Sequence, residues 1–177
     1  MIIDSQMETL VFGFELGDIF RHIVVLGFSG LLIAAAVTDL RRFLIPNSLV
    51  VALLALWPFW VALSGFPPIG GALLCALAVF ILGAGLFTFG FMGGGDVKLL
   101  TVLALWAGMD GLEGLIVLLL LTSVAGGALS VLWVSRWRHR IAPLIGWAEG
   151  LRDNKHIPYG VAIAAGGLSV AKRLWIG

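Results

Sequence analysis

Residues 90–100 read GFMGGGDVKLL and place three consecutive glycines and a carboxylate, Asp96, between two long apolar runs. A charged residue at the centre of a bilayer costs roughly 2.5–3.5 kcal/mol on insertion scales, so a carboxylate at that depth indicates a functional site by default. Glycine adopts backbone conformations closed to other residues and lets a neighbouring segment approach closely. Irregular backbone at bilayer depth occurs only where it is buried in protein or lines a wet cavity. The stretch therefore predicts a site, and Asp96 requires a partner from elsewhere in the chain.

The composition of the chain is that of a membrane protein. Of its 177 residues, 60% are hydrophobic and 12% are charged, with a mean hydropathy of +1.09, whereas soluble domains carry about 25% charged residues. Several apolar runs approach the roughly 20 residues that a helix needs to cross a bilayer. The single cysteine, Cys75, excludes an internal disulfide and a multi-cysteine zinc site. We expect an all-α polytopic membrane protein, folded as one membrane-embedded domain over residues 1–177, without a metal or other cofactor.

The apolar runs predict six transmembrane helices, separated by turn signals such as Ser64-Gly65-Phe66-Pro67-Pro68. The expected spans are residues 19–38, 46–63, 69–91, 96 to about 107, 112–134 and 157–174. Pro46 is well placed as the first residue of its helix. Acidic residues among apolar ones predict an interfacial lead-in over residues 1–18, and the polar segment 135–156 predicts a helix on the cytoplasmic interface.

The lysines and arginines predict the orientation, because these residues collect on the cytoplasmic side of membrane proteins. The outer side receives Arg21, Lys172 and Arg173, and the adjacent Lys172 and Arg173 are the one clear conflict with this rule. Asp39 and Asp96 then both lie at cytoplasmic ends of their spans, which makes Asp39 the expected partner of Asp96. With the amino terminus outside, eight of the eleven basic residues fall on the inner side: Arg41, Arg42, Lys98, Arg136, Arg138, Arg140, Arg152 and Lys155.

The fourth expected span is unusually short. The 12 residues from Val97 to Gly108 would extend about 18 Å as a helix, well short of the roughly 30 Å hydrocarbon core. Either the bilayer thins locally or the glycine loop lies below the cytoplasmic surface. The second arrangement puts Asp96 in a recessed, water-accessible pocket.

Two carboxylates with no other evident catalytic set indicate aspartic chemistry. In an aspartic dyad one ionised carboxylate activates water and the protonated one polarises the scissile carbonyl, since close like charges cannot both stay ionised. Asp39 follows a helix carboxyl end and Asp96 opens a helix, so the helix dipole favours charge on Asp96. We therefore expect Asp96 to be the base and Asp39 to hold the proton. The competing interpretation is a membrane assembly or transport protein that uses both residues as an ion or proton site.

Three segments together resemble the type IV prepilin peptidase family of GxGD intramembrane aspartic proteases. Gly93-Gly94-Gly95-Asp96 fits the GxGD signature, and Asp39 followed by Ile45-Pro46-Asn47 fits the other aspartate segment. Ile157-Pro158-Tyr159-Gly160 is similar to the Pro-Tyr-Gly segment at the start of that family's last span. The three segments occur in the expected order and extend over most of the chain.

This resemblance implies an aspartic endopeptidase that removes the leader peptide from prepilins and pseudopilins at the cytoplasmic face of the bacterial inner membrane. It makes Asp39 and Asp96 the catalytic pair. The expected partners are these substrates of the type IV pilus kind and the lipid bilayer, with no nucleic acid. The residues expected to support the pair are Gly93, Gly94, Gly95, Lys98, Pro46, Asn47, Pro158, Tyr159 and Gly160.

The chain departs from the larger members of that family, which also methylate the new amino terminus. Those members carry an additional cytoplasmic domain with paired cysteines, and this chain has neither room for the domain nor the cysteines. It is similar to the short, peptidase-only members associated with tight-adherence (Flp-type) pili, so we expect no N-methyltransferase activity. An archaeal preflagellin-type peptidase or another GxGD protease is the nearest alternative, and the Ile-Pro-Asn and Pro-Tyr-Gly segments favour the bacterial branch.

Overall fold

The computed structural model describes the backbone of residues 2–134 and 157–176, and the side chains of residues 16–132 and 157–175. Every regular element within these ranges is a helix, which confirms the expected helical fold class. The predicted cytoplasmic segment 135–156 lies outside the described residues. In chain order the elements are α1 (Ile2–Arg42), α2 (Asn47–Leu63), α3 (Gly70–Thr88), α4 (Gly94–Ala107), the 3-10 turn η1 (Gly108–Asp110), α5 (Gly111–Val134) and α7 (Tyr159–Ile176).

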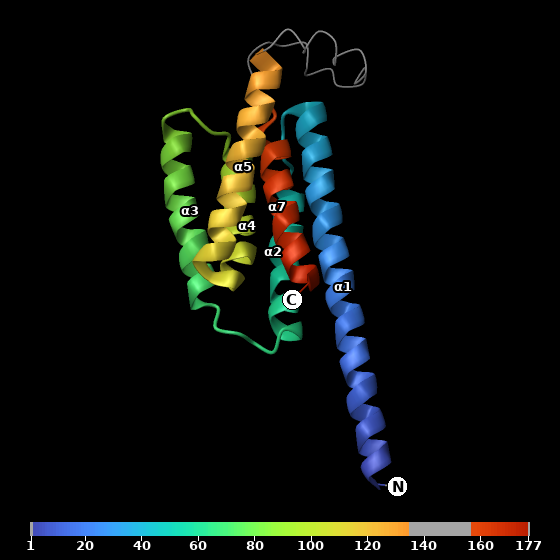
Figure 1. Cartoon of the computed structure of the whole chain (residues 1–177). Coiled ribbons are helices and arrows are strands. Elements are labelled where there is room, and N and C mark those ends of the chain that lie inside the picture. Colours follow the sequence, from blue (N-terminus) through green and yellow to red (C-terminus); the bar gives the residue numbers. More distant parts are fainter. Residues whose placement is uncertain (1, 135–156, 177) are drawn as a thin grey trace.

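The helices lie side by side in an elongated bundle (Figure 1). Contacts join α1 with α2, α3 with α4, and α5 with α7. Helix α7 also packs against α1 and α4, so it links the first helix to the later ones. The end of α1, the start of α4 and the start of α7 therefore meet at one end of the bundle, the upper end in Figure 1.

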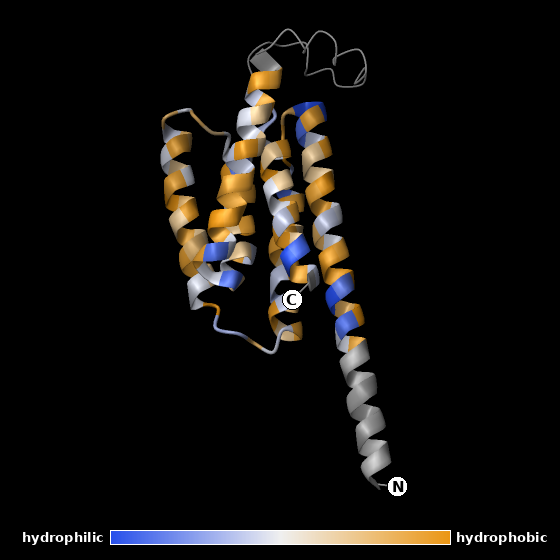
Figure 2. Cartoon of the chain, in the orientation of Figure 1, coloured by the Kyte–Doolittle hydropathy of each residue, from blue (hydrophilic) through white to orange (hydrophobic). Residues whose placement is uncertain are grey.

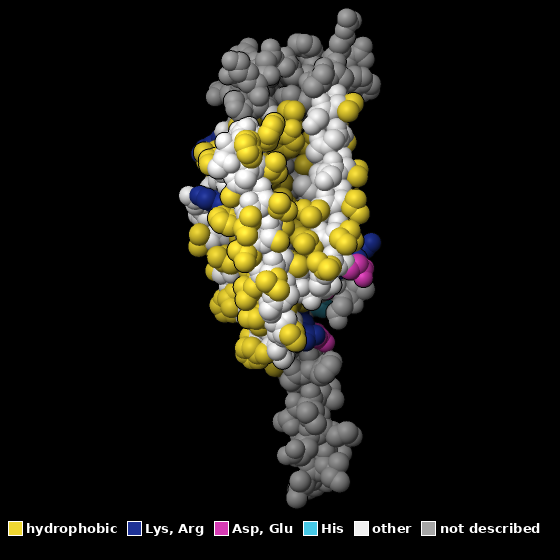
Figure 3. All heavy atoms as spheres, turned by 90° about the vertical axis from the view of Figure 1, so that its left-hand side faces the viewer, with side chains coloured by type: hydrophobic (Ala, Val, Ile, Leu, Met, Phe, Trp, Pro, Cys, Tyr) yellow, Lys and Arg dark blue, Asp and Glu magenta, His cyan; other side chains and the backbone are white. Residues whose placement is uncertain are grey.

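The bundle has the surface of a membrane protein. Three stretches are long and apolar enough to cross a membrane: Leu16–Arg42, Gly70–Thr88 and Gly94–Leu132, the last of which runs from α4 into α5. Hydrophobic residues fill the middle of the bundle and hydrophilic ones gather near its ends (Figure 2). Hydrophobic side chains also cover most of the face seen in Figure 3. Helix α2 is apolar but shorter, and α7 is not among the candidate spans, so the count of six spans stays a prediction.

Every described helix begins at another residue than the sequence suggested, and α1 and α2 show two physical reasons. Helix α1 starts at Ile2 and continues unbroken through the expected lead-in 1–18, since no proline interrupts this part of the chain. Pro46 has extended backbone, with φ −61° and ψ 135°, and occupies the position before α2. Helix α2 therefore begins at Asn47, one residue later than expected.

Helix α3 ends at Thr88, three residues before the predicted end, because Gly90 reverses the chain. Gly90 has a φ of 74°, a conformation that costs glycine little. The N–H of Gly90 donates to the carbonyl of Phe87 at 2.9 Å, and the N–H of Phe91 donates to the carbonyl of Leu86 at 2.9 Å. This pair of bonds is a Schellman motif, which terminates helices. It directs the following residues toward α4.

The buried Trp106 of α4 holds three helices together. Its ring packs against Phe28 of α1, with ring centroids 4.6 Å apart, and against Trp60 of α2, with centroids 6.3 Å apart. Its indole Nε1 donates a hydrogen bond to the carbonyl of Leu53 at 3.1 Å. Asp39 lies in α1 and Asp96 lies in α4. The cluster therefore holds the helices of the two expected catalytic residues in place relative to each other.

Ion pairs gather at the end of the bundle away from Asp39. Arg173 of α7 binds Glu113 at 2.8 Å and lies 3.8 Å from Asp110. Arg21 of α1 lies 3.6 Å from Asp18. Acidic partners therefore offset the charges of Arg21 and Arg173, two of the three basic residues predicted on the outer side. Arg173 belongs to the adjacent basic pair that conflicted with the charge rule.

Candidate active site

The glycine-rich stretch forms the connection from α3 to α4 and the first turn of α4. Gly93 precedes α4 with extended backbone, and Asp96 lies in the first helical turn. The carboxylate of Asp96 turns back onto the backbone of Gly93, and a Cβ added to Gly93 would lie 3.0 Å from Asp96 Oδ2. The free N–H groups at the start of a helix stabilise negative charge, so the position of Asp96 suits a carboxylate.

The other two glycines of the run allow close approach of the surrounding elements. A Cβ added to Gly94 would lie 3.4 Å from the ring of Phe87 on α3. One added to Gly95 would lie 3.3 Å from Cβ of Ile45, in the loop that follows α1. The glycine run thus packs directly against the segment that carries Asp39.

Asp39 is buried near the end of α1, with 5% of its surface exposed, and its Oδ2 has no hydrogen-bond partner. The start of α7 presses against this carboxyl group. A Cβ added to Gly160 would lie 2.7 Å from Asp39 Oδ2 and 2.9 Å from Cδ1 of Ile45. The backbone N–H groups of Gly160 and Val161 interact with the carboxylate. Only glycine therefore fits at position 160 without displacing Asp39.

Asp39 and Asp96 line the same hollow. Two adjoining pockets, of about 450 and about 430 Å³, share Asp39, Phe43, Gly93 and Asp96 among the residues that line them. The two carboxyl groups are close enough for their charges to interact. Residues far apart in the sequence, from α1 and from the start of α4, are thus brought to one polar cavity.

A hydrogen bond links the two aspartate segments at the rim of this hollow. Lys98 Nζ donates to Oδ1 of Asn47 at 3.0 Å, and both side chains are exposed. Lys98 lies one half-turn beyond Asp96 in α4, and Asn47 opens α2 after the loop that follows Asp39. The bond therefore ties the start of α2 to the start of α4 beside the two acids.

The structure brings together the residues expected to support the pair. Pro158 is fully buried and precedes α7, and Gly160 touches Asp39. The remaining ones all line the hollow: Pro46, Asn47, Gly93, Gly94, Gly95, Lys98 and Tyr159. Phe43 also lines both of its parts, with a φ of 49°, and was missed because nothing marks an apolar residue after two arginines as special.

The structure adds a second helix terminus to the surroundings of Asp39, which the helix-dipole argument from the sequence did not include. Asp39 lies within α1 and faces the start of α7, whose first N–H groups interact with its carboxylate. Asp96 lies in the first turn of α4. The dipole at the start of α7 thus favours negative charge on Asp39 while that at the end of α1 opposes it, whereas Asp96 lies at a helix amino terminus only. The prediction that Asp96 is the base and that Asp39 holds the proton considered only the helix that carries each residue, and it stays a prediction.

Acidic side chains in a cavity can also coordinate a metal ion. Among the residues described, no group of three or more His, Cys, Asp or Glu side chains is arranged to hold a metal ion. The polar groups of the hollow, among the residues described, are two carboxyl groups, backbone N–H groups, the side chain of Tyr159 and one lysine–asparagine pair.

Two carboxyl groups in one cavity at the end of an apolar helical bundle define a class: helical membrane proteins with a two-aspartate site. The particular family follows from comparison with known proteins. The chain belongs to the type IV leader peptidase family, a family of aspartic-type peptidases whose model matches residues 26–131.

Two curated relatives agree with this membership. The "Prepilin leader peptidase/N-methyltransferase" proteins of Burkholderia pseudomallei strains 1026b and K96243 are each 30% identical to the chain over 151 residues. Each match covers 80% of this chain and 43% of the relative, so the chain spans less than half the length of these relatives. No solved structure matches the chain significantly.

Proposed function

We propose that the chain is an aspartic endopeptidase that removes leader peptides from prepilins and pseudopilins within the membrane. The observation that carries this proposal is the hollow that Asp39 and Asp96 line together. Membership in the type IV leader peptidase family supports a peptidase. The names of the two relatives support leader-bearing prepilins as the substrate class.

The proposed reaction uses the two acids as a coupled pair. One carboxylate takes a proton from a water molecule, whose oxygen attacks the scissile carbonyl, while the other acid donates its proton toward that carbonyl oxygen. Collapse of the tetrahedral intermediate breaks the C–N bond, and the leaving amine takes up a proton from the pair. The N–H groups of Gly160 and Val161 hold Asp39 in place for these transfers, and the backbone of Gly93 holds Asp96.

We place the hollow at the cytoplasmic face of a bacterial inner membrane. Eight of the eleven basic residues fall on that side in the proposed topology, and the positive-inside rule favours such an arrangement. Arg41, Arg42 and Lys98 lie at the same end of the bundle as Asp39 and Asp96. In this placement the chain acts as one membrane-embedded domain whose acids face the compartment where basic leaders are found.

We further propose that this chain does not methylate the trimmed pilin. Its only cysteine is Cys75, which is buried in α3 and cannot form the cysteine pair expected of bifunctional members. Incubation of the purified chain with a prepilin and a labelled methyl donor should trim the pilin and leave it unlabelled. Label on the trimmed pilin would overturn this part of the proposal.

Co-expression with a prepilin tests the proposed cleavage. The chain should convert the prepilin to a smaller form whose new amino terminus lies after the leader. Asp39→Asn and Asp96→Asn should each abolish the size shift, while the variant proteins remain in the membrane fraction at normal levels. An unchanged prepilin with the wild-type chain would refute the proposal and leave the ion or proton site as the alternative.

A further inference from the structure

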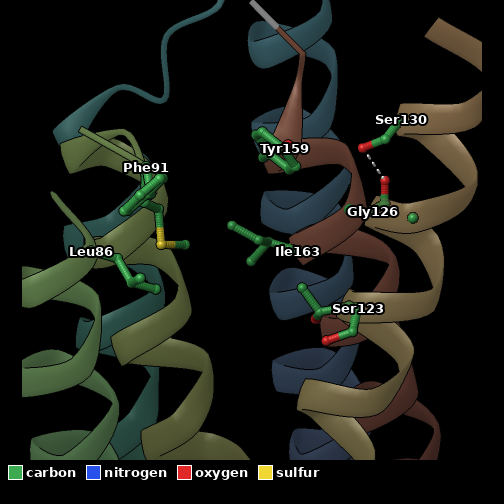
Figure 4. Close-up of a pocket in the computed structure, with 11 residues that line it drawn as sticks. Leu86, Phe91, Ser123, Gly126, Ser130, Tyr159 and Ile163 are labelled. Carbon is green, nitrogen blue, oxygen red and sulfur yellow. Dashed lines mark hydrogen bonds between the residues drawn. The ribbon is translucent and has the colours of Figure 1, made fainter. Parts of the chain in front are cut away.

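A second pocket, of about 400 Å³, opens beside the hollow that holds the two acids (Figure 4). Leu86 of α3, with Phe91 and Met92 of the following turn, forms one side. Tyr159 and Ile163 of α7 face this side in the close-up. We call this pocket the α3–α5 groove, because α5 forms its other side. Its lining is mostly apolar and contains no charged side chain, unlike that of the aspartate hollow.

The α5 side of the groove carries small side chains along one stripe. Ser123, Gly126, Gly127 and Ser130 all line it, and their spacing of three, four and seven residues puts them on one face of the helix. The hydroxyl of Ser130 is satisfied within α5 by the carbonyl of Gly126 at 2.8 Å (Figure 4). Small residues let another helix backbone approach closely, and membrane helices associate through such surfaces.

The groove is continuous with the aspartate hollow. Phe91, Met92 and Tyr159 line both the groove and the larger of the two pockets that form the hollow, the one of about 450 Å³. Phe91 and Tyr159 lie at the same end of the groove, the upper end in Figure 4, whereas Ser123 lies at the other. A helix in the groove would therefore have one end at the two acids.

Two of the apolar side chains that line the groove are largely exposed among the residues that the structure describes. Phe91 is 75% exposed and Leu86 is 47% exposed. A Cβ added to Gly127 would meet nothing within 4 Å among the described residues, which leave this side of α5 uncovered. From Ser123 to Ser130 the groove follows α5 for about 10 Å, or roughly two helical turns. That length suits the end of one helix rather than a whole transmembrane span.

We propose that the α3–α5 groove binds the first turns of the apolar helix of a leader-bearing pilin substrate and directs the leader junction to Asp39 and Asp96. This inference rests on the proposed peptidase function. An apolar helix attached to a basic leader is the occupant whose chemistry matches both cavities, because its apolar part fits the groove and its junction reaches the polar hollow. Ser123 and Gly127 are binding residues in this arrangement, and Tyr159 lies at the passage between the two cavities.

Disulfide cross-linking tests the contact directly. Full-length chain carrying Cys75→Ala and Ser123→Cys is co-expressed with prepilins that have single cysteines along the first turns of the apolar helix. The matched control is Val124→Cys, since Val124 lies at the same depth, is 66% exposed and does not line the groove. We expect oxidation to join the substrate to Ser123→Cys at one helical face and to leave Val124→Cys unjoined.

Cleavage of the same prepilins separates the two proposals. If the prepilin is trimmed but Ser123→Cys forms no cross-link, or Val124→Cys cross-links equally well, the groove assignment is wrong and the peptidase function stands. Cross-linking of Ser123→Cys to a second copy of the chain in place of the substrate would also overturn the assignment. If the Cys75→Ala parent trims no prepilin while the wild-type chain does, the Cys75-containing protein replaces it as parent. If the wild-type chain trims none, the peptidase function itself fails.

Filling the groove gives an independent kinetic readout. Gly127→Leu places a branched side chain where the substrate helix would lie, and we expect the KM for prepilin to rise about tenfold with little change in kcat, as for loss of uniform binding. Ala128→Leu is the matched control, because Ala128 is exposed, adjacent and outside the lining of the groove. An equal effect of both substitutions, or none from Gly127→Leu, would contradict the proposal.

Discussion

The carboxyl group of Asp39 is packed against the backbone at the start of α7, and this contact sets the size limit at Gly160. A methyl group there would lie 2.7 Å from Oδ2 and 2.8 Å from Cγ of Asp39, closer than carbon and oxygen atoms can approach without movement. The carboxyl group, the start of α7 or both must then shift. Because the proposed mechanism depends on the relative positions of the two acids, we expect such a shift to affect catalysis before it affects the fold.

Gly160→Ala should therefore lower the rate of prepilin cleavage by about a hundredfold, the effect of misplacing a catalytic group by roughly 1 Å. Gly71→Ala is the control, because a Cβ at Gly71 would meet nothing within 4 Å. The rates are measured on purified protein in detergent or lipid, together with the amount of folded protein. A Gly160→Ala variant as active as Gly71→Ala would show that the packing of α7 on Asp39 is not needed.

The bond from Lys98 to Asn47 is exposed, so its net contribution to folding stability should be below about 1 kcal/mol. We expect the main role of this bond to be holding the start of α2 against the start of α4. Lys98→Ala and Asn47→Ala should each slow cleavage by about fivefold, equivalent to about 1 kcal/mol in the barrier, and the double variant should be no slower than either. A double-mutant cycle in the cleavage rate measures this coupling. Strictly additive losses would mean that the two residues act separately.

At the residue scale, the sequence predicted the identity of the site residues better than their environments. Asp39, Asp96 and the glycine run were recognisable from carboxylates and glycines between apolar runs, and Gly160 from a family motif. The contact of Gly160 with Asp39 was not predictable, because it depends on how α7 packs against α1. The same packing brings the start of α7 to Asp39, a second helix terminus that the sequence did not reveal, and the assignment of the proton to Asp39 stays a prediction.

At the scale of helices, the packing of α7 depends on small residues in its middle. A Cβ added to Gly166 would overlap the hydroxyl oxygen of Thr122 on α5. One added to Gly167 would lie 2.9 Å from the side chains of Leu103 and Leu32, on α4 and α1. Gly160, which contacts Asp39, lies in the same helix. The close packing at Gly166 and Gly167 therefore determines where the start of α7 lies relative to Asp39.

Gly166→Ala should destabilise the protein by about 1–3 kcal/mol, the usual cost of overpacking a tight interface. Adding Thr122→Ala should recover part of this loss, because the smaller side chain leaves room for the new methyl group. Thermal unfolding in one detergent compares the Tm of both variants with that of Gly71→Ala. If Gly166→Ala leaves the Tm unchanged, or if Thr122→Ala gives no recovery, helices α5 and α7 are less closely packed than described.

Most helices were predictable because apolar runs and turn residues mark them. The glycine and proline signals located the turns before α3 and α4, although α3 ended at Thr88 through the Schellman turn at Gly90. The acidic residues near the amino terminus suggested a separate lead-in, yet α1 includes residues 2–18. Local charge alone does not end a helix, and a helix ends reliably only where the backbone cannot continue.

At the scale of the whole molecule, the proposed orientation puts the two ends of α2 on opposite sides of the membrane. Ser48, at its start, is exposed beside the aspartate hollow, and Phe66, just beyond its end, is 77% exposed at the other end of the bundle. In a Cys75→Ala parent, Phe66→Cys should react with an impermeant maleimide added to intact spheroplasts. Ser48→Cys should react only after the membrane is opened. The reverse pattern would invert the topology and place the acids outside the cytoplasm.

The central claim is that Asp39 and Asp96 act as one catalytic unit. The most direct test measures kcat for leader removal by purified wild-type chain, Asp39→Asn, Asp96→Asn and the double variant. Residues that act as a unit have strongly non-additive effects, so each single variant should lose about 10⁴-fold or more in kcat and the double variant should be no worse. A single variant that keeps the wild-type rate, or losses that multiply in the double variant, would contradict the account.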